Sequence, residues 1–417
     1  MRRVNIGFGT AMVGVAVFAV QAAEAGGTGG AGVELIGRAA VSALASDLSG
    51  LDNIIGNNIP HDRFGGWGSA IARTGKGNRY IVASDRGPGD GSSAFRCRVH
   101  VIEIVPSTSE MREVKVLIEK TVMLTTSDGQ PYWGNTGNYR AGDPAAGLRL
   151  DPEGVRVSRE GTLWVSEEYG PWIDEFSMDG LHLRRIAPPE KFLIAKPDGE
   201  PERELPPHNM SGRQANRGFE GLAISPDGAR IYTILQGPLI QDGALDGENE
   251  RMGRNIRVLE VTLATGATRE FVYPLNSASF GVSEILAYSE TGMLVLERDG
   301  KSGEKAKFRS VFAVDLSEAT DVSGVAALPT VGLPAEIRPL RKRLLVDFME
   351  RRHRLAGPEM PEKIEGLAFG PDLADGRRLL VVTSDNDFKD EIPSHIWLFA
   401  VDPSDLRGFT QQEFAAP

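Results

Sequence analysis

The fold is decided by the stretch Gly218-Phe219-Glu220-Gly221-Leu222-Ala223-Ile224-Ser225-Pro226-Asp227-Gly228 and by the apolar run Ile231-Tyr232-Thr233-Ile234-Leu235 that follows it. Apolar and β-branched residues alternate along both segments, a pattern typical of β-strands. Between them, Pro226-Asp227-Gly228 is a turn sequence, because proline presets the backbone and glycine tolerates a positive φ. The stretch therefore predicts an antiparallel hairpin. Its unusual feature is a carboxylate, Glu220, at the beginning of the first strand.

The same strand–turn–strand pattern recurs three times, each time with a glutamate near the beginning of its first strand. The copies begin with Asp151-Pro152-Glu153-Gly154, Ser283-Glu284-Ile285-Leu286 and Ile364-Glu365-Gly366-Leu367. A weaker fifth copy, Ser49-Gly50-Leu51-Asp52, has serine in place of glutamate, and we expect Tyr80–Ala83 as its partner strand. Successive glutamates are 67, 64 and 81 residues apart. Units of this size are somewhat longer than common propeller repeats, but each still indicates a small antiparallel sheet.

A small sheet with two apolar faces must pack against neighbours, and radial closure is the usual solution. We therefore predict an all-β fold, a β-propeller with five readable blades. Five to seven blades are possible, because a sixth could lie within 106–147 or 320–357. The segment Val33–Leu44 is expected to close the ring by pairing with the last blade, at His395–Val401. Apolar spacing over Leu340–Met349 predicts a covering helix with an arginine-rich face.

The first 25 residues have the pattern of an export signal. Arg2 and Arg3 precede a short apolar run, and Ala23-Glu24-Ala25 provides small residues for cleavage. We expect residues 1–25 to be a signal peptide, 26–32 a glycine-rich linker and 33–417 a single propeller domain. This organisation predicts a periplasmic or secreted bacterial protein without a stable membrane span. A single cysteine, Cys97, excludes an intramolecular disulfide and is expected to be buried.

The balance of charge disfavours two classes of partner. The formal net charge is −11, and removal of residues 1–25 leaves −12 because that segment carries +1. Such a chain repels nucleic acid and anionic lipid unless its charge is segregated, but it is suited to holding cations. The composition indicates a globular protein, which we expect to be a monomer that acts on a small molecule.

If the glutamates open the innermost strands, they line one mouth of the central channel. Carboxylates at close range cannot all remain ionised without a partner. Either a hard cation or nearby arginines must neutralise them, and oxygen ligands at variable coordination favour Ca²⁺. The candidate metal ligands are Glu153, Glu220, Glu284, Glu365, Asp85 and Glu297. In the alternative interpretation, each Glu-Gly pair only binds the backbone of a neighbouring blade and ties the ring together.

The order of several short motifs resembles that of the bacterial phytase-like family, also described as esterase-like activity of phytase. The motifs are Ser49-Gly50-Leu51, Ser84-Asp85-Arg86, Asp151-Pro152-Glu153-Gly154, Ser166-Glu167-Glu168, Gly218-Phe219-Glu220-Gly221-Leu222, Leu296-Glu297-Arg298, Ile364-Glu365-Gly366-Leu367 and Ser384-Asp385-Asn386-Asp387-Phe388. The resemblance extends from about Leu35 to Val401. It implies an exported β-propeller that hydrolyses phosphate or other esters.

These observations lead to three hypotheses. The first is a Ca²⁺-dependent phosphoester hydrolase, in which Arg86 or Arg298 balances developing charge and Glu167, Glu168 or Asp385 orients water. The second is a lactonase or carboxylesterase in which a metal polarises a carbonyl group. The third is a non-catalytic binding propeller of the cell envelope, whose channel cation is structural.

Overall fold

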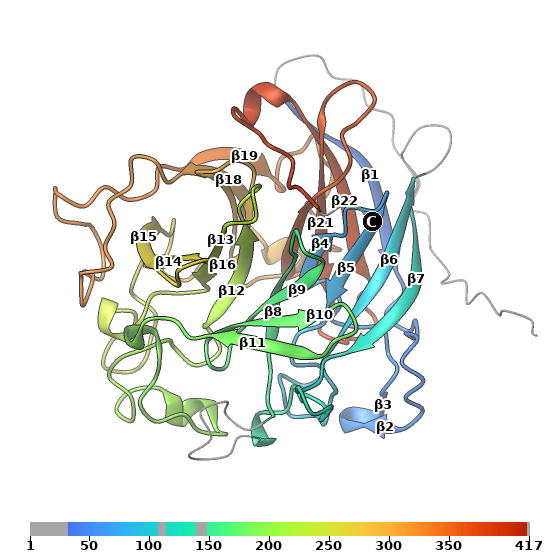
Figure 1. Ribbon diagram of the computed structural model, residues 1–417, viewed down its shortest axis with the longest axis horizontal. Helices are drawn as coiled ribbons and strands as arrows, with labels where there is room; N and C mark the ends of the chain where they lie inside the picture. The colour runs from blue at the N-terminus through green and yellow to red at the C-terminus, as the bar shows by residue number, and fades with distance from the viewer. Residues whose placement is uncertain (1–31, 107–113, 139–147, 415–417) are drawn as a thin grey trace, which may run out of the picture.

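Five antiparallel sheets of four strands each surround one axis in the computed structural model, which describes residues 32–106, 114–138 and 148–414 (Figure 1). The protein is a five-bladed β-propeller, as the repeated hairpins predict. In the first four blades the chain runs from the innermost strand outward. The first blade consists of β4 (Ala70–Arg73), β5 (Arg79–Ala83), β6 (Arg98–Pro106) and β7 (Val114–Met123), and the second of β8 (Pro152–Val157), β9 (Thr162–Glu167), β10 (Trp172–Ser177) and β11 (His182–Ile186). The third consists of β12 (Phe219–Ile224), β13 (Arg230–Leu235), β14 (Asn255–Thr262) and β15 (Thr268–Pro274), and the fourth of β16 (Gly281–Ala287), β17 (Gly292–Arg298), β18 (Arg309–Asp315) and β19 (Arg343–Asp347).

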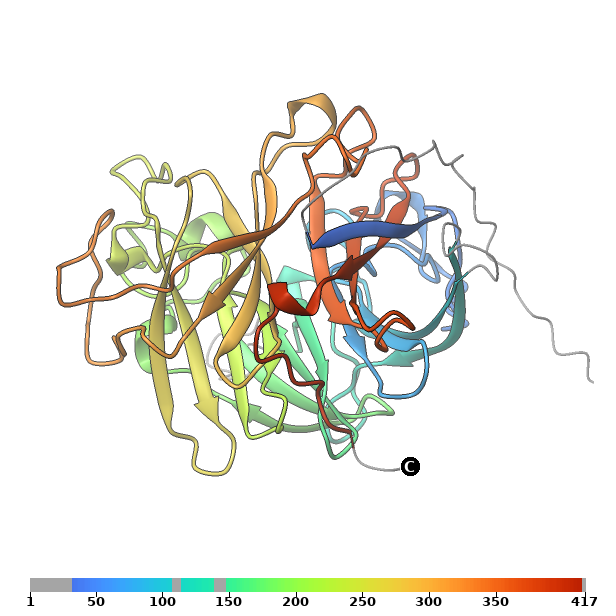
Figure 2. The ribbon, with the colours of Figure 1, turned by 90° about the horizontal axis from the view of Figure 1, so that it is seen from above.

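The fifth blade joins the two ends of the described chain. It is formed from β20 (Lys363–Phe369), β21 (Arg378–Asp385), β22 (Ser394–Val401) and the N-terminal strand β1 (Val33–Val41). β1 runs antiparallel to β22, with Val33 opposite Val401 and Val41 opposite Ser394. Figure 2 shows β1 in blue beside the red C-terminal strands. The predicted closure by the N-terminal segment is confirmed, and it covers an edge that would otherwise be free to pair with another chain.

The hydrophobic core lies between neighbouring blades. The inner strands contact one another in the order β4, β8, β12, β16 and β20, and β20 returns to β4. Apolar side chains from adjacent sheets fill the spaces between them. For example, Trp164 of the second blade packs in one cluster with Ile231 of the third and Met293 of the fourth. Cys97 is buried as predicted, and its thiol donates to the Leu150 carbonyl at 3.2 Å.

The predicted helix over Leu340–Met349 is wrong. This segment contains β19, which completes the fourth blade by pairing with β18. Its apolar residues fit helical spacing, but Leu345 and Val346 are buried against the sheet while Leu344 and Arg343 remain exposed. An unpaired edge on β18 would leave backbone groups unsatisfied, and strand pairing satisfies them. The helices of the described residues are single 3₁₀ turns: η1 (Gly56–Asn58), η2 (Thr136–Asn138), η3 (Glu190–Phe192), η4 (Pro201–Glu204), η5 (Ile240–Asp242), η6 (Gly303–Lys305) and η7 (Pro403–Asp405).

The first blade begins later in the chain than predicted. Tyr80–Ala83 pairs with β4, whereas Ser49–Asp52 contributes no strand. The residues that follow form a small separate hairpin of β2 (Ile54–Ile55) and β3 (Ile59–Pro60). No sixth blade lies in the described parts of 106–147 or 320–357, because these segments supply the outer strands β7 and β19.

The C-terminal segment covers one end of the central channel. The Gln412 side chain donates to the Val157 carbonyl at 2.7 Å, and the Thr410 amide donates to the Tyr288 carbonyl at 2.8 Å. The Glu413 amide donates to the Pro226 carbonyl at 3.1 Å. These acceptors lie at or beyond the far ends of inner strands β8, β12 and β16. The inner strands begin at the opposite end of the ring.

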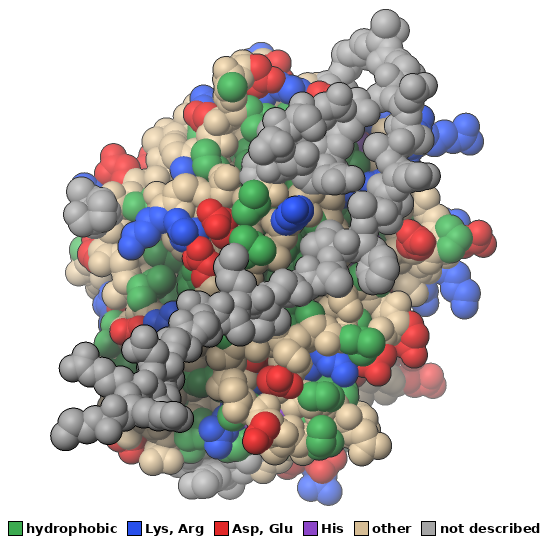
Figure 3. Space-filling view, turned by 90° about the vertical axis from the view of Figure 1, so that its right-hand side faces the viewer, with side chains coloured by type: hydrophobic (Ala, Val, Ile, Leu, Met, Phe, Trp, Pro, Cys, Tyr) green, Lys and Arg blue, Asp and Glu red, His purple; other side chains and the backbone are tan. Residues whose placement is uncertain are grey.

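The predicted cellular location depends on the N-terminal segment and on whether any helix could span a membrane. The expected signal peptide, 1–25, lies outside the described residues, as does most of the expected linker. In the part of the chain that the structure describes, we find no helix with the length and apolarity needed to cross a membrane. On the face in Figure 3, acidic and basic side chains are interspersed.

Candidate functional site

A β-bulge at the beginning of three inner strands determines which side chains reach the channel mouth. The pairing register shifts between Pro152 and Gly154, between Phe219 and Gly221, and between Ile364 and Gly366. The residue skipped by each shift is a glutamate: Glu153, Glu220 or Glu365. A bulge leaves one residue outside the ladder and changes the direction of its side chain. The three glutamates of the second, third and fifth blades therefore hold equivalent positions.

The fourth blade differs because its bulge lies one residue before the glutamate, whereas comparison of the motifs placed the glutamate itself at the bulge. Its register shifts between Val282 and Glu284, so the residue at the glutamate position is Ser283. Glu284 takes the place that glycine holds in the other three blades. Its side chain is fully buried and accepts from the amides of Leu222 at 3.0 Å and Ile285 at 2.9 Å. The four glutamates are thus not equivalent as the sequence suggested.

Glu284 forms an ion pair inside the ring instead of joining the other carboxylates. Its Oε2 lies 3.0 Å from the guanidinium of Arg156, which also donates to the carbonyls of Ile71 and Ile285. These contacts connect four of the inner strands. Burial raises the pKa of Glu284 to about 7, and Arg156 opposes that rise. The role of a tie between blades, which the sequence left open for every glutamate, matches the contacts of Glu284.

The first blade also lacks a glutamate at the mouth. A Cβ added at Gly221 would lie 2.5 Å from the amide nitrogen of Ile285, and one at Gly366 would lie 3.2 Å from that of Ile71. Gly221 thus approaches the residue that follows the glycine position of the next blade, Glu284. Gly366 approaches Ile71 in the same way, so Ala70 holds the glycine position of the first blade. The residue before it, Ser69, takes the glutamate position and donates its hydroxyl to the Gly66 carbonyl. Serine does replace glutamate in this blade, but at Ser69 and not in Ser49-Gly50-Leu51.

Asp151, Glu153 and Glu168 form a buried cluster of carboxylates at the beginning of β8 and the end of β9. One oxygen from each lies within 4.8 Å of the others. Arg86, which follows β5, contacts two of them through Nη1, at 2.9 Å from Asp151 and 3.4 Å from Glu168. Its backbone amide also donates to Asp151 at 2.9 Å. One guanidinium therefore faces three carboxyl groups.

Glu220 adds a fourth carboxylate beside this cluster. The side-chain amide of Gln236 donates to its Oε1, but Oε2 is buried without a hydrogen-bond partner in the described structure. Burial raises the pKa of Glu220 well above its ordinary value, and the Glu168 carboxylate raises it further. Burial and then Glu220 have the same effect on the pKa of Glu153. We refer to Asp151, Glu153, Glu168 and Glu220 as the acidic mouth.

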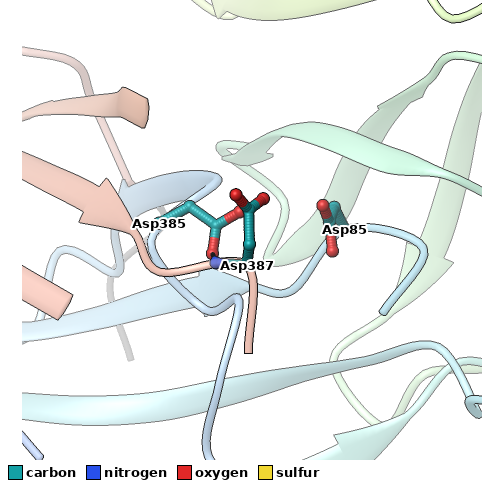
Figure 4. Close-up of side chains that lie close together, drawn as sticks. All are labelled: Asp85, Asp385 and Asp387. Atoms are coloured by element: carbon teal, nitrogen blue, oxygen red, sulfur yellow. Dashed lines mark hydrogen bonds between the residues drawn. The ribbon is translucent and has the colours of Figure 1, made fainter. Parts of the chain in front are cut away.

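A second group of carboxylates, Asp85, Asp385 and Asp387, lies between the first and fifth blades (Figure 4). The ammonium group of Lys363 lies 3.5, 3.4 and 2.5 Å from their respective oxygens. Burial raises the pKa of Asp85 to about 6 and that of Asp385 to about 7. Although burial opposes it, Lys363 lowers the pKa of Asp387 to about 2. This group, the lysine cluster, already contains a cation.

Arginines occupy the side of the mouth formed by the third and fourth blades. Arg298 binds Glu365 at 2.7 Å and donates to the Ser283 hydroxyl at 2.9 Å, so the fifth-blade glutamate is neutralised. Arg217 is 5% exposed and has no ion pair within 4.0 Å among the described residues. Burial, followed by the charge of Arg251, lowers the pKa of Arg217 to about 9. Glu220 and Glu168 are close enough to oppose this shift.

Two predicted site residues lie away from the mouth. Glu167 accepts from the amides of Tyr169, at 3.0 Å, and Gly170, and so holds the turn after β9. Glu297 accepts from the Tyr273 hydroxyl at 2.8 Å and pairs with Lys342. Sequence reasoning grouped them with the others because each follows a second strand. Successive side chains point to opposite faces of a strand, so a shift of one residue changes the environment completely.

Sequence reasoning also missed several groups that the structure brings to the mouth. The missed residues are Asp151, Arg217, Gln236, Lys363 and Asp387. Asp151 and Lys363 each lie two residues before a predicted glutamate, so the bulge motif itself could have indicated them. Gln236 is the counterpart of Glu168, one residue beyond the second strand of its blade. No local signal marks Arg217, because only the fold places it near Arg251 and Arg298.

Comparison with known proteins finds a relative that is described as secreted. A protein described as an uncharacterized secreted protein, from Arthroderma benhamiae, is 30% identical over 247 residues, which cover 47% of each chain. The chain thus matches about half the length of this curated relative. A luciferin-regenerating enzyme aligns at 12% identity with a TM-score of 0.34, covering 85% of this chain and 97% of that one. A gluconolactonase from Xanthomonas campestris aligns at 12% identity with a TM-score of 0.32, covering 88% and 90%. Structural similarity at this level identifies no shared activity.

The family assignment rests on a longer match. Residues 62–388 match the family described as Phytase-like: Esterase-like activity of phytase. The match begins before β4 and ends after Asp387, so it includes the four bulges, the acidic mouth and the lysine cluster. The resemblance drawn from the short motifs is confirmed over most of the chain. This five-bladed propeller belongs to the phytase-like (esterase-like activity of phytase) family.

Proposed function

We propose that this protein is an exported, Ca²⁺-dependent hydrolase of phosphate esters and that the acidic mouth is its active site. The observation that carries the proposal is the buried cluster of Asp151, Glu153 and Glu168 beside Glu220, whose Oε2 has no partner. Buried carboxylates at this spacing can all be ionised only when positive charge compensates them, and Arg86 supplies only one such charge. The description of the family supports ester hydrolysis. The secreted relative supports export.

The donor set fits Ca²⁺ better than other common metal ions. All the candidate ligands are carboxylate oxygens, which hard cations prefer, and no histidine or cysteine lies among them. Ca²⁺ accepts six to eight oxygen ligands in variable geometry, whereas Mg²⁺ requires a near-ideal octahedron. The lysine cluster fits a metal less well, because the Lys363 ammonium already contacts its three carboxylates. Asp151, Glu153, Glu168 and Glu220 are therefore the residues that would hold the ion.

The surrounding residues have separate tasks in this proposal. A bound Ca²⁺ would supply positive charge that polarises a phosphoryl oxygen and activates water. Arg86 orients Asp151 and Glu168 through its hydrogen bonds with both. Gln236 fixes Glu220 by binding one of its oxygens, which leaves the other toward the site. Asp385, which the sequence suggested as a residue that orients water, lies in the lysine cluster and contacts Lys363.

The test combines metal analysis with a substrate panel and one matched pair of variants. Elemental analysis of purified protein should find Ca²⁺, and phosphate release from phosphomonoesters should be lost in EDTA and restored by Ca²⁺. Glu153→Gln should reduce Ca²⁺ affinity and hydrolysis together. Glu160→Gln is the control, because Glu160 is exposed at the opposite end of the same β8–β9 hairpin and undergoes the same change of charge.

Other outcomes would separate the alternative functions. Metal-dependent opening of lactones or cleavage of carboxylesters without phosphate release would replace the phosphoesterase proposal with the lactonase or carboxylesterase hypothesis. Tight Ca²⁺ binding with no turnover on the whole panel would favour a binding propeller. Absence of bound metal, together with melting curves unaffected by EDTA, would contradict the metal site itself.

A further inference from the structure

The third and fourth blades place a positively charged surface beside the acidic mouth. Arg217 lies directly before the inner strand β12, and its guanidinium is buried. Among the described residues its one hydrogen bond is long, at 3.5 Å to the Phe280 carbonyl, and its Nε has no partner. Buried arginines normally have a carboxylate partner, because an unpaired charge is costly to remove from water. Arg217 thus lacks the partner that its burial demands.

The backbone around Arg217 is shaped to admit its side chain. A Cβ added at Gly237 would lie 2.6 Å from Arg217 Nη1. A Cβ added at Gly281 would lie 3.5 Å from Nη2. These glycines follow β13 and begin β16, so the guanidinium lies where the third and fourth blades meet at the mouth. Any residue other than glycine at position 237 would therefore displace the guanidinium.

The charges next to Arg217 are also positive. Arg251 and Arg298 both act against its protonated form, so three guanidinium groups converge on this side. Arg298 is neutralised by Glu365. Arg251 is exposed and, like Arg217, makes no ion pair within 4.0 Å among the described residues. Two guanidinium groups without an ion pair within 4.0 Å in the described residues therefore lie beside the acidic mouth, whose Glu220 and Glu168 act on Arg217 only from a longer range.

We propose that Arg217, assisted by Arg251, forms an oxyanion subsite that binds the phosphate group of a ligand. Guanidinium groups present several N–H donors in a planar fork that matches phosphate oxygens. Two guanidinium groups that form no salt bridge match a phosphate dianion better than a singly charged carboxylate. The identification of this phosphate with part of a substrate rests on the proposed function. Binding of the anion does not, because it can be measured without turnover.

Calorimetric titration with inorganic phosphate tests this subsite, in EDTA and at a fixed low concentration of Ca²⁺. Arg217→Gln should weaken phosphate binding about 10- to 100-fold, the range expected for loss of a charge-assisted hydrogen bond. Arg217→Lys should be intermediate, because it keeps the charge and loses the fork. Arg159→Gln, an exposed site at the opposite end of β8, is the control and should bind like the wild type.

Two additions keep the test decisive. If Arg217→Gln does not fold, Gly237→Ala displaces the guanidinium while retaining its charge, and it should also weaken phosphate binding. Acetate should bind the wild type more weakly than phosphate. The subsite is refuted if the wild type does not bind phosphate, or if Arg217→Lys and Gly237→Ala both bind it like the wild type. Equal affinity for acetate would overturn the assignment to phosphate. Phosphate binding without hydrolysis would contradict the proposed function and leave the subsite intact.

Discussion

Glu284 and Glu220 lie in similar sequence motifs, yet replacing each with glutamine should change stability in opposite directions. The Glu284 carboxylate is fully buried and binds the amides of Leu222 and Ile285 and the guanidinium of Arg156. Glutamine at this position removes the charge and leaves Arg156 buried without a counterion. Breaking a buried ion pair from one side costs about 3–5 kcal/mol of unfolding free energy. The loss should be the same in EDTA and in Ca²⁺, because Glu284 is not part of the acidic mouth.

Glu220 has the opposite balance of contacts. Its Oε2 has no hydrogen-bond partner, and the carboxylate faces Glu168. In EDTA, Glu220→Gln removes a buried charge that repels its neighbours. It should therefore leave stability unchanged or raise it by about 1–3 kcal/mol, the cost of an unsatisfied buried group. In Ca²⁺ the same variant should lose the stabilisation that ligand binding gives the wild type.

Urea unfolding of the wild type and both variants, in EDTA and in saturating Ca²⁺, measures these differences. Midpoints should be compared only where the denaturant slopes agree, since a change in slope signals a change in the unfolding transition itself. Glu160→Gln again controls for the loss of one negative charge. The reasoning is refuted if Glu220→Gln and Glu284→Gln destabilise the metal-free protein by similar amounts, or if the loss in Glu284→Gln depends on Ca²⁺.

Two further predictions concern pH and closure of the ring. Burial raises the pKa of Asp85 and Asp151 to about 6 and of Asp385 to about 7, so the folded protein binds more protons than the unfolded chain between about pH 4 and pH 7. In EDTA the melting temperature should therefore fall as the pH rises from about 4 to about 7, and saturating Ca²⁺ should reduce that fall; a rise with pH in EDTA would contradict the assignment of these shifts. Deletion of residues 33–41 removes β1 and exposes the edge of β22, so it should lower the melting temperature sharply and promote aggregation in light scattering, whereas an unchanged melting curve would refute closure by this strand.

The architecture was predictable because each blade carries its own local signals. Alternating apolar residues and turn sequences such as Pro226-Asp227-Gly228 specify hairpins without reference to the rest of the chain. Their repetition indicates the propeller, and one apolar segment, Val33–Leu44, remains to close it. The segment Leu340–Met349 was misassigned for the same reason. Its apolar residues satisfy helical spacing, and only the free edge of β18 selects the strand.

The register of the bulges was not predictable from the sequence. Ser283 and Glu284 are adjacent polar residues, and aligning the glutamate with Glu153, Glu220 and Glu365 is the natural choice. Side chains alternate between faces along a strand, so a slip of one residue moves a group to a different environment. Here it transfers Glu284 from the mouth to an ion pair with Arg156, and it brings Ser283 beside Arg298. Hydrogen bonding between strands decides this choice.

The chemical role of each carboxylate depends on whether a positively charged side chain from a distant part of the chain pairs with it. Lys363 contacts Asp85, Asp385 and Asp387, while Arg298 pairs with Glu365. What remains are the carboxylates of the acidic mouth, which share Arg86, and the guanidinium of Arg217 on the other side. Separated charges of opposite sign match a ligand that combines a cation with an anion, as a metal-bound phosphate does. No single sequence motif indicates such a site, because the site depends on charged groups that the fold leaves without an ion pair of their own.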